Sequence, residues 1–140
     1  MPNAPTPPTS MTPQEIVQYW ITTAEDDWQS VQNLFDKQDY VKALFFGHLY
    51  LEKLLKALIV QISRAHAPYG HTLNTLAEKA KLTLNPDQTV LLRRVTDYNI
   101  QARYPDWKLE FKKRCTREFC QGELKQIENL GQWLRTMLKP

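Results

Sequence analysis

The segment YVKALFFGHLYLEKLLKALIVQI, residues 40–62, constrains the fold more than any other part of the chain. Read as a helix, its apolar side chains cover well over half of the circumference, whereas a surface helix carries a single apolar stripe. We therefore expect a central helix that other helices surround. Charged residues interrupt every 18-residue window, so we do not expect it to span a membrane. Its polar residues share one arc, which we expect to face solvent, a site or a partner: Lys42, His48, Glu52, Lys53, Lys56 and Ser63.

The size of the chain and its two cysteines indicate one cytoplasmic domain without disulfide bonds. A chain of 140 residues is long enough to bury a core without covalent cross-links. Cys115 and Cys120 form neither a CxxC pair nor a Cys/His ligand pattern, and we expect them to be core residues in a reducing cytosol. The first residues lack the apolar core of a signal peptide, so we expect a cytoplasmic location.

The beginning of the chain divides into a tail and a helix. Residues 1–11 contain four of the nine prolines, and we expect a disordered Pro-rich tail there. In the sequence Thr12-Pro13-Gln14-Glu15, Thr12 can cap a helix, Pro13 suits its first position and Glu15 can complete a capping box. An apolar seam then continues to about Lys37, so we expect one helical domain over residues 12–140 that opens with an amphipathic helix.

The rest of the chain predicts further helices and no strand. The apolar spacing favours a short helix over residues 72–81, and Asn85-Pro86-Asp87-Gln88 begins another whose seam runs to about Tyr104. Pro105 disfavours helical geometry in the residue before it, so we expect residues 103–107 to turn out of that helix. A last helix is expected over residues 109–138. The fold class is therefore all-α, an up-and-down bundle of four to five helices.

The net charge of +3 is unevenly distributed along the chain. The segment 93–117 carries eight Lys or Arg against three acids, a local charge of +5, and the remainder of the chain is at −2. Two interpretations stay open: a solvated helix face, or a surface for an anionic partner such as RNA, a nucleotide or an acidic protein. The densest part of this basic patch contains Lys112, Lys113, Arg114 and Arg117.

Three stretches of the chain resemble, in order, the signature stretches of HEPN domains. They are LFFGHLYLEKLLKALI (44–59), with an "ExxxKA" core, HTLNTLAEKA (71–80), with "HxL", and YNIQARYPD (98–106), with an arginine before "YP". The resemblance covers about residues 16–137. The matching positions are Glu52, Lys56, Ala57, His71, Leu73, Arg103, Tyr104 and Pro105.

The resemblance implies a helical bundle that commonly forms a homodimer. Stand-alone prokaryotic members are often encoded beside a minimal nucleotidyltransferase, and some such pairs act as toxin and antitoxin. The family name records a nucleotide-binding role, and many members are metal-independent endoribonucleases with an Arg-x4-6-His motif. This chain departs from that motif: the positions after Arg103 hold Lys108, Leu109 and Glu110, and no His follows His71. The Arg64 to His71 spacing fits, but it lies elsewhere in the chain and we take it as a chance match.

These observations support two hypotheses about function. The preferred one is a non-catalytic module that binds nucleotide or RNA phosphate and pairs with the nucleotidyltransferase; the other is an endoribonuclease toxin in which Arg103 meets His71 or His48 across a dimer interface. Arg103 either grips a phosphate or fixes its helix end, and Tyr104 and Trp107 offer aromatic faces for a base. The candidate ligand-binding residues are Arg103, Tyr104, Asp106, His71, Lys56 and Glu52.

Neither a metal nor a cofactor is expected. His48 and Glu52 are spaced as a metal-binding pair on a helix, but the sequence offers no third ligand beside them. We expect Lys53 and Lys56 to lay their aliphatic stems on apolar surface and to extend their amines into water.

Overall fold

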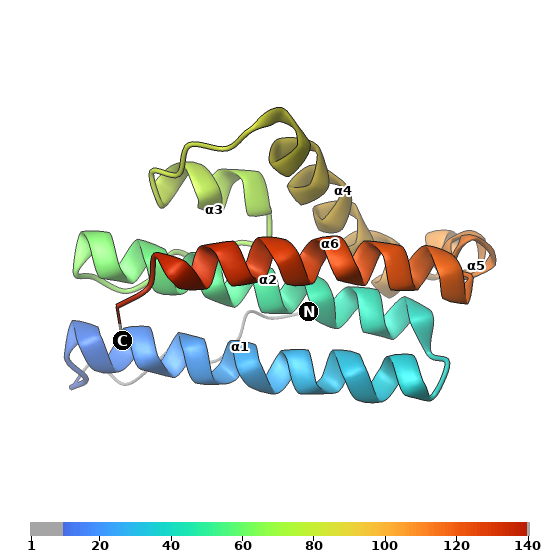
Figure 1. Cartoon of the computed structure of the whole chain (residues 1–140), viewed down its shortest axis with the longest axis horizontal. Coiled ribbons are helices and arrows are strands. Elements are labelled where there is room, and N and C mark those ends of the chain that lie inside the picture. The colour runs from blue at the N-terminus through green and yellow to red at the C-terminus, as the bar shows by residue number, and fades with distance from the viewer. Residues whose placement is uncertain (1–9, 140) are drawn as a thin grey trace.

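The computed structural model describes residues 10–139, except the side chains of residues 105 and 106. Over this part of the chain it contains six helices and no strand. Figure 1 shows the helices of residues 13–36, 40–63 and 117–136 running along the bundle in alternating directions, and the helix of residues 86–103 crossing them at an angle. Both short helices pack against that crossing helix. The fold is thus the all-α up-and-down bundle that the sequence predicts. The helices are α1 (Pro13–Asp36), α2 (Tyr40–Ser63), α3 (Leu73–Lys79), α4 (Pro86–Arg103), α5 (Pro105–Arg114) and α6 (Arg117–Thr136).

Two helices begin where their capping sequences predict. At α1, the Thr12 hydroxyl accepts from the Glu15 amide at 3.2 Å, and the Glu15 carboxylate accepts from the Thr12 amide at 2.9 Å. Asn85 and Gln88 exchange the equivalent bonds at the start of α4, at 2.8 and 2.9 Å. Each box satisfies two backbone donors that a helix start leaves open. Most of the predicted tail, residues 1–9, lies outside the described residues, and Met11 packs against the core.

The α2 helix lies at the centre of the core. It packs against all five other helices, and its core leucines are fully buried. Polar contacts join it to α1, where the Lys53 ammonium lies 2.6 Å from the Asp27 carboxylate. Burial raises the pKa of Asp27, and Lys53 opposes that rise. Within the part of the chain that is described, no helix is long and apolar enough to cross a membrane.

A second polar contact joins α4 to α6. Arg94 binds the Glu123 carboxylate through two nitrogens, at 2.6 and 3.1 Å, and the Tyr98 hydroxyl donates to the same carboxylate. Burial and the Glu123 charge both raise the pKa of Tyr98, so this hydroxyl keeps its proton. The contact therefore fixes the orientation of α4, the helix that ends at Arg103.

The predicted last helix, residues 109–138, is in fact two helices. The first, α5, ends at Arg114, and the second, α6, begins at Arg117 with the Thr116 hydroxyl accepting from the Phe119 amide at 3.1 Å. The predicted end of α4 near Tyr104 is confirmed, but Pro105 then opens α5 instead of a loop. Both cysteines, Cys115 and Cys120, are buried, as expected.

Candidate functional site

A stripe of three polar residues on α2 is buried inside the bundle. His48, Glu52 and Lys56 follow one another at intervals of four, which places them on one face of the helix. His48 and Glu52 are 0% exposed and Lys56 is 1% exposed. The expectation that the Lys53 and Lys56 amines extend into water is therefore wrong, because the Lys53 side chain is only 11% exposed and pairs with Asp27. The Lys56 ammonium instead donates to Glu52 at 3.1 Å and lies 5.5 Å from the centre of the Trp20 ring of α1.

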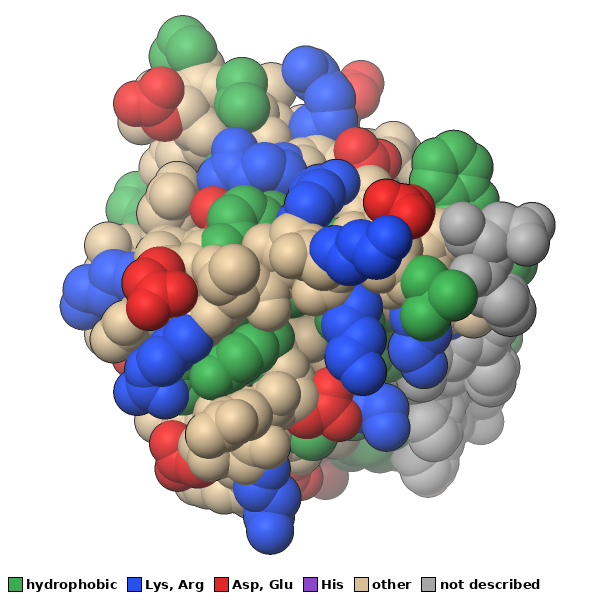
Figure 2. All heavy atoms as spheres, turned by 90° about the vertical axis from the view of Figure 1, so that its right-hand side faces the viewer, with side chains coloured by type: hydrophobic (Ala, Val, Ile, Leu, Met, Phe, Trp, Pro, Cys, Tyr) green, Lys and Arg blue, Asp and Glu red, His purple; other side chains and the backbone are tan. Residues whose placement is uncertain are grey.

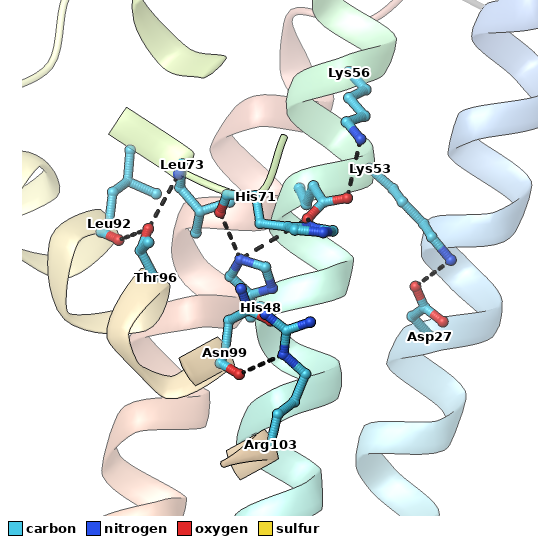
Figure 3. A network of polar contacts seen from close by, with 11 residues as sticks. Asp27, His48, Lys53, Lys56, His71, Leu73, Leu92, Thr96, Asn99 and Arg103 are labelled. Atoms are coloured by element: carbon cyan, nitrogen blue, oxygen red, sulfur yellow. Dashed lines mark hydrogen bonds and ion pairs between the residues drawn. The ribbon is translucent and has the colours of Figure 1, made fainter. Parts of the chain in front are cut away.

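The chain that leads into α3 closes this stripe from the other side. The Nδ1 atom of His71 lies 2.7 Å from the Glu52 carboxylate, and the His71 backbone oxygen lies 2.8 Å from the Nε2 atom of His48 (Figure 3). Both partners are acceptors, so the two ring nitrogens donate. Glu52 thus accepts from His71 and Lys56 together, and these bonds satisfy a buried charge that would otherwise be costly.

His48 is a neutral residue of the interior. Burial lowers its pKa, and the negative charge of Glu52 opposes that effect. Its Nε2 proton is committed to the His71 carbonyl. The other nitrogen, Nδ1, has no hydrogen-bond partner among the described residues. The ring therefore holds the entry to α3 against α2 with one of its two nitrogens.

Arg103 reaches the same network from the end of α4. Its Nε donates to the Asn99 backbone oxygen at 3.1 Å, and its guanidinium lies 5.5 Å from the centre of the Tyr104 ring. The side chain points toward His48, as Figure 3 shows. The predicted role in fixing the helix end is thus present. Arg103 and His71 are both partly buried, so they mark the outer edge of the polar cluster, whereas His48, Glu52 and Lys56 are enclosed.

The aromatic candidates beside Arg103 are exposed. Tyr104 is 51% exposed and Trp107 is 58% exposed, and both lie at the start of α5. Ile100 and Leu109, on either side of them in the chain, are exposed as well. The side chain of Asp106 lies outside the described residues.

The residues of the predicted basic patch have different neighbours in the structure. The Lys113 ammonium lies 3.3 Å from the Glu110 carboxylate, Arg114 lies over the Phe111 ring, and Arg117 lies over the Phe35 ring. Lys112 instead lines a groove beside the connection between α1 and α2. Lys113, Arg114 and Arg117 thus each contact a residue of the same chain, whereas Lys112 lies in the groove.

Sequence reasoning placed His48 on one arc with Glu52 and Lys56 but did not count it among the candidate ligand-binding residues, and it missed Asn99. The signal for His48 was present, because its spacing of four from Glu52 and eight from Lys56 puts all three on one stripe. Asn99 contributes only a backbone oxygen to Arg103, so its residue type carried no signal. Among the described residues, no three His, Cys, Asp or Glu side chains are grouped as metal ligands would be.

Residues from all three signature stretches of the sequence, Glu52, His71 and Arg103, thus lie close together in the structure. The chain belongs to the HEPN domain family, whose model matches residues 17–137. Among solved structures, it is similar to TT1696 from Thermus thermophilus, with a TM-score of 0.72 and 21% sequence identity. That match covers 87% of this chain and 98% of the other, and at this identity it shows a shared fold. No curated protein matches the chain.

Proposed function

We propose that this chain is a non-catalytic HEPN module that binds the phosphate of a nucleotide or RNA through Arg103. The observation that carries the proposal is the convergence of three separate stretches on one polar cluster, with Arg103 at its outer edge. A buried polar cluster of this kind costs desolvation energy, and such clusters concentrate at functional sites. The hydrogen bond from the Arg103 Nε to the Asn99 backbone oxygen orients the planar guanidinium of Arg103. The guanidinium is the group best suited to bind two phosphate oxygens at once.

The exposed aromatic rings support a ligand that carries a base. Tyr104 follows Arg103 directly, and Trp107 lies one helical turn further on in α5. Both rings offer faces on which a nucleobase stacks, at about 1–3 kcal/mol per base. A phosphate held by Arg103 would place its nucleoside beside these rings.

The burial of His48 favours binding over catalysis. A general base must come within hydrogen-bond reach of the RNA 2′-hydroxyl, and the histidine toward which Arg103 points is 0% exposed. One observation favours the alternative, an endoribonuclease that needs no metal. The side chain of His71 is 23% exposed, and Glu52 fixes its Nδ1, the arrangement by which a carboxylate orients a catalytic imidazole.

One reaction separates the two functions. RNA of about 12 nucleotides is incubated with the protein in buffer with chelator, and each sample is divided between a native and a denaturing gel. We expect a complex with intact RNA, and we expect Arg103→Gln to weaken binding by about tenfold or more, because charged hydrogen bonds contribute about 1.5–3 kcal/mol. Arg93→Gln, at an exposed arginine of the same helix, is the matched control and should bind normally.

Two results would contradict this proposal. Unchanged RNA binding by the Arg103→Gln variant would show that Arg103 does not hold a phosphate. RNA cleavage that disappears in His71→Gln would instead establish the endoribonuclease function, because that substitution keeps a hydrogen-bond donor for Glu52 and removes the acid–base group.

The proposed module pairs with a minimal nucleotidyltransferase encoded nearby, in a toxin–antitoxin system, and forms a homodimer in the cytoplasm. The exposed apolar side chains of Ile100 and Leu109 support a protein contact at the junction of α4 and α5. Co-purification with the neighbouring gene product, followed by native mass measurement, tests the pairing. We expect a complex of both chains; two separate species at micromolar concentration would contradict it.

A further inference from the structure

A groove lined by four lysines lies at one end of the bundle. It has a volume of about 490 Å³ and lies between α5 and the connection from α1 to α2. Figure 2 views this end of the molecule, and Lys and Arg side chains gather across it. The side chains of all four lysines are exposed to solvent. They are Lys37, Lys42, Lys108 and Lys112.

The residues that line the groove carry a positive net charge even when the one acidic residue among them is included. Among the described residues that line the groove, Asp39 is the one acid. Its carboxylate caps α2 by accepting from the Lys42 amide at 3.3 Å, and it lies 3.7 Å from the Lys42 ammonium. Asp39 offsets one of the four lysine charges, so the residues that line the groove keep a net charge of about +3. Four cations around one hollow repel one another, and an anionic ligand relieves that repulsion.

A stripe on α5 joins this groove to Arg103. Lys108 and Lys112 are four residues apart and share one face of α5, and Tyr104, the residue that precedes the helix, lies four residues before Lys108. Lys108 and Lys112 are about 6 Å apart along the helix axis, at 1.5 Å per residue. An aromatic ring followed by cations along a groove is the pattern of proteins that bind single-stranded nucleic acid.

We propose that the lysine groove binds the phosphate backbone of single-stranded RNA, whose strand continues along α5 to Arg103. This inference rests on the proposed function and adds to it the class of ligand: a strand of several nucleotides instead of a mononucleotide. The phosphate at Arg103 fixes one end of the strand, Tyr104 stacks on a base, and Lys108 and Lys112 lead the backbone to the two lysines of the α1–α2 connection.

The test compares two variants of equal charge. In the groove variant the four groove lysines become glutamine, and in the control four exposed lysines elsewhere do so: Lys79, Lys81, Lys125 and Lys139. Binding of RNA of about 12 nucleotides is measured between about 50 and 200 mM salt. Each phosphate contact with a single strand contributes about 0.7 to the slope of log K against log salt. We expect the groove variant to lose up to about 3 from that slope, and the control to lose much less.

The outcomes separate this inference from the proposed function. If the groove variant and the control keep equal slopes while Arg103→Gln binds weakly, the groove inference is wrong and the Arg103 site stands. If the groove variant alone loses binding, the groove stands and the Arg103 site is wrong. Polyglutamate is the second probe: if it competes with RNA for the groove at equal charge concentration, the groove binds acidic protein and the RNA assignment is overturned. Binding of AMP should be unchanged by the groove variant, and its loss would also contradict the inference.

Discussion

Replacing Lys56 with methionine removes a charge from a buried ion pair and keeps the length of the side chain. The Lys56 ammonium lies 3.1 Å from the carboxylate of Glu52, and both residues are essentially inaccessible to solvent. Removing one partner leaves the other charge in the interior, which costs about 3–5 kcal/mol. The contact of the ammonium with the Trp20 ring is lost as well. Since domains are typically stable by about 5–15 kcal/mol, Lys56→Met should lose a large share of its stability and still fold.

A second substitution isolates the electrostatic part of this cost. In the double variant Glu52→Gln, Lys56→Met, no carboxylate remains, and the glutamine amide oxygen can still accept from His71. We therefore expect the double variant to be more stable than Lys56→Met alone, with a coupling energy of at least about 1.5 kcal/mol. The control is Lys42→Met on the same helix, where the side chain is 59% exposed and the change should stay within about 0.5 kcal/mol.

Urea unfolding followed by circular dichroism measures all of these free energies. Equal m values across the variants would show that each one unfolds in the same two-state manner. A cost below about 1 kcal/mol for Lys56→Met would refute the assignment of a buried ion pair. Additive costs in the double variant would refute the coupling between Glu52 and Lys56.

Two further predictions concern packing and pH. In α6, Gly131→Ala places a Cβ within the space that the Tyr50 ring occupies, so we expect a net loss of stability. The Cβ of Gly122→Ala in the same helix meets nothing within 4 Å, so this variant should gain about 1 kcal/mol in the same urea titration. Equal effects of the two substitutions would contradict the close packing of Gly131 against Tyr50. Burial lowers the pKa of His48 from 6.5, so the unfolded chain binds a proton there at higher pH than the folded chain does. Stability should therefore fall as the pH drops below about 6.5, by at most about 1.4 kcal/mol per pH unit from this group. His48→Gln should flatten that part of the profile, and an unchanged profile would refute the assignment.

The parts of the fold that depend on local chemistry were predictable from the sequence. The capping sequences at Thr12 and Asn85 set helix starts within a few residues, and Pro105 set the end of α4. Apolar side chains around most of the helix of residues 40–62 identified it as the central helix from the sequence alone. The break between α5 and α6 was missed because Thr116 caps without a Glu or Gln three residues later, and neither Gly nor Pro marks the turn.

The parts of the site that depend on tertiary packing were not predictable. Whether the Lys56 amine reaches water is decided by what covers the polar stripe of α2, here α1 and the residues before α3. The lysine groove likewise joins the α1–α2 connection to α5, two segments far apart in the chain. A count of charge along the sequence therefore identified Lys108 and Lys112 as part of a basic segment but did not place them beside Lys37 and Lys42.

The affinity of the Arg103→Lys variant for RNA tests the central proposal most directly. This substitution keeps the positive charge and removes the planar fork that binds two phosphate oxygens. We expect affinity for RNA of about 12 nucleotides to fall about tenfold while the salt dependence stays unchanged, because the number of charged contacts is the same. Affinity within about twofold of the original chain would show that Arg103 contributes only charge, and would contradict a phosphate site built around its guanidinium.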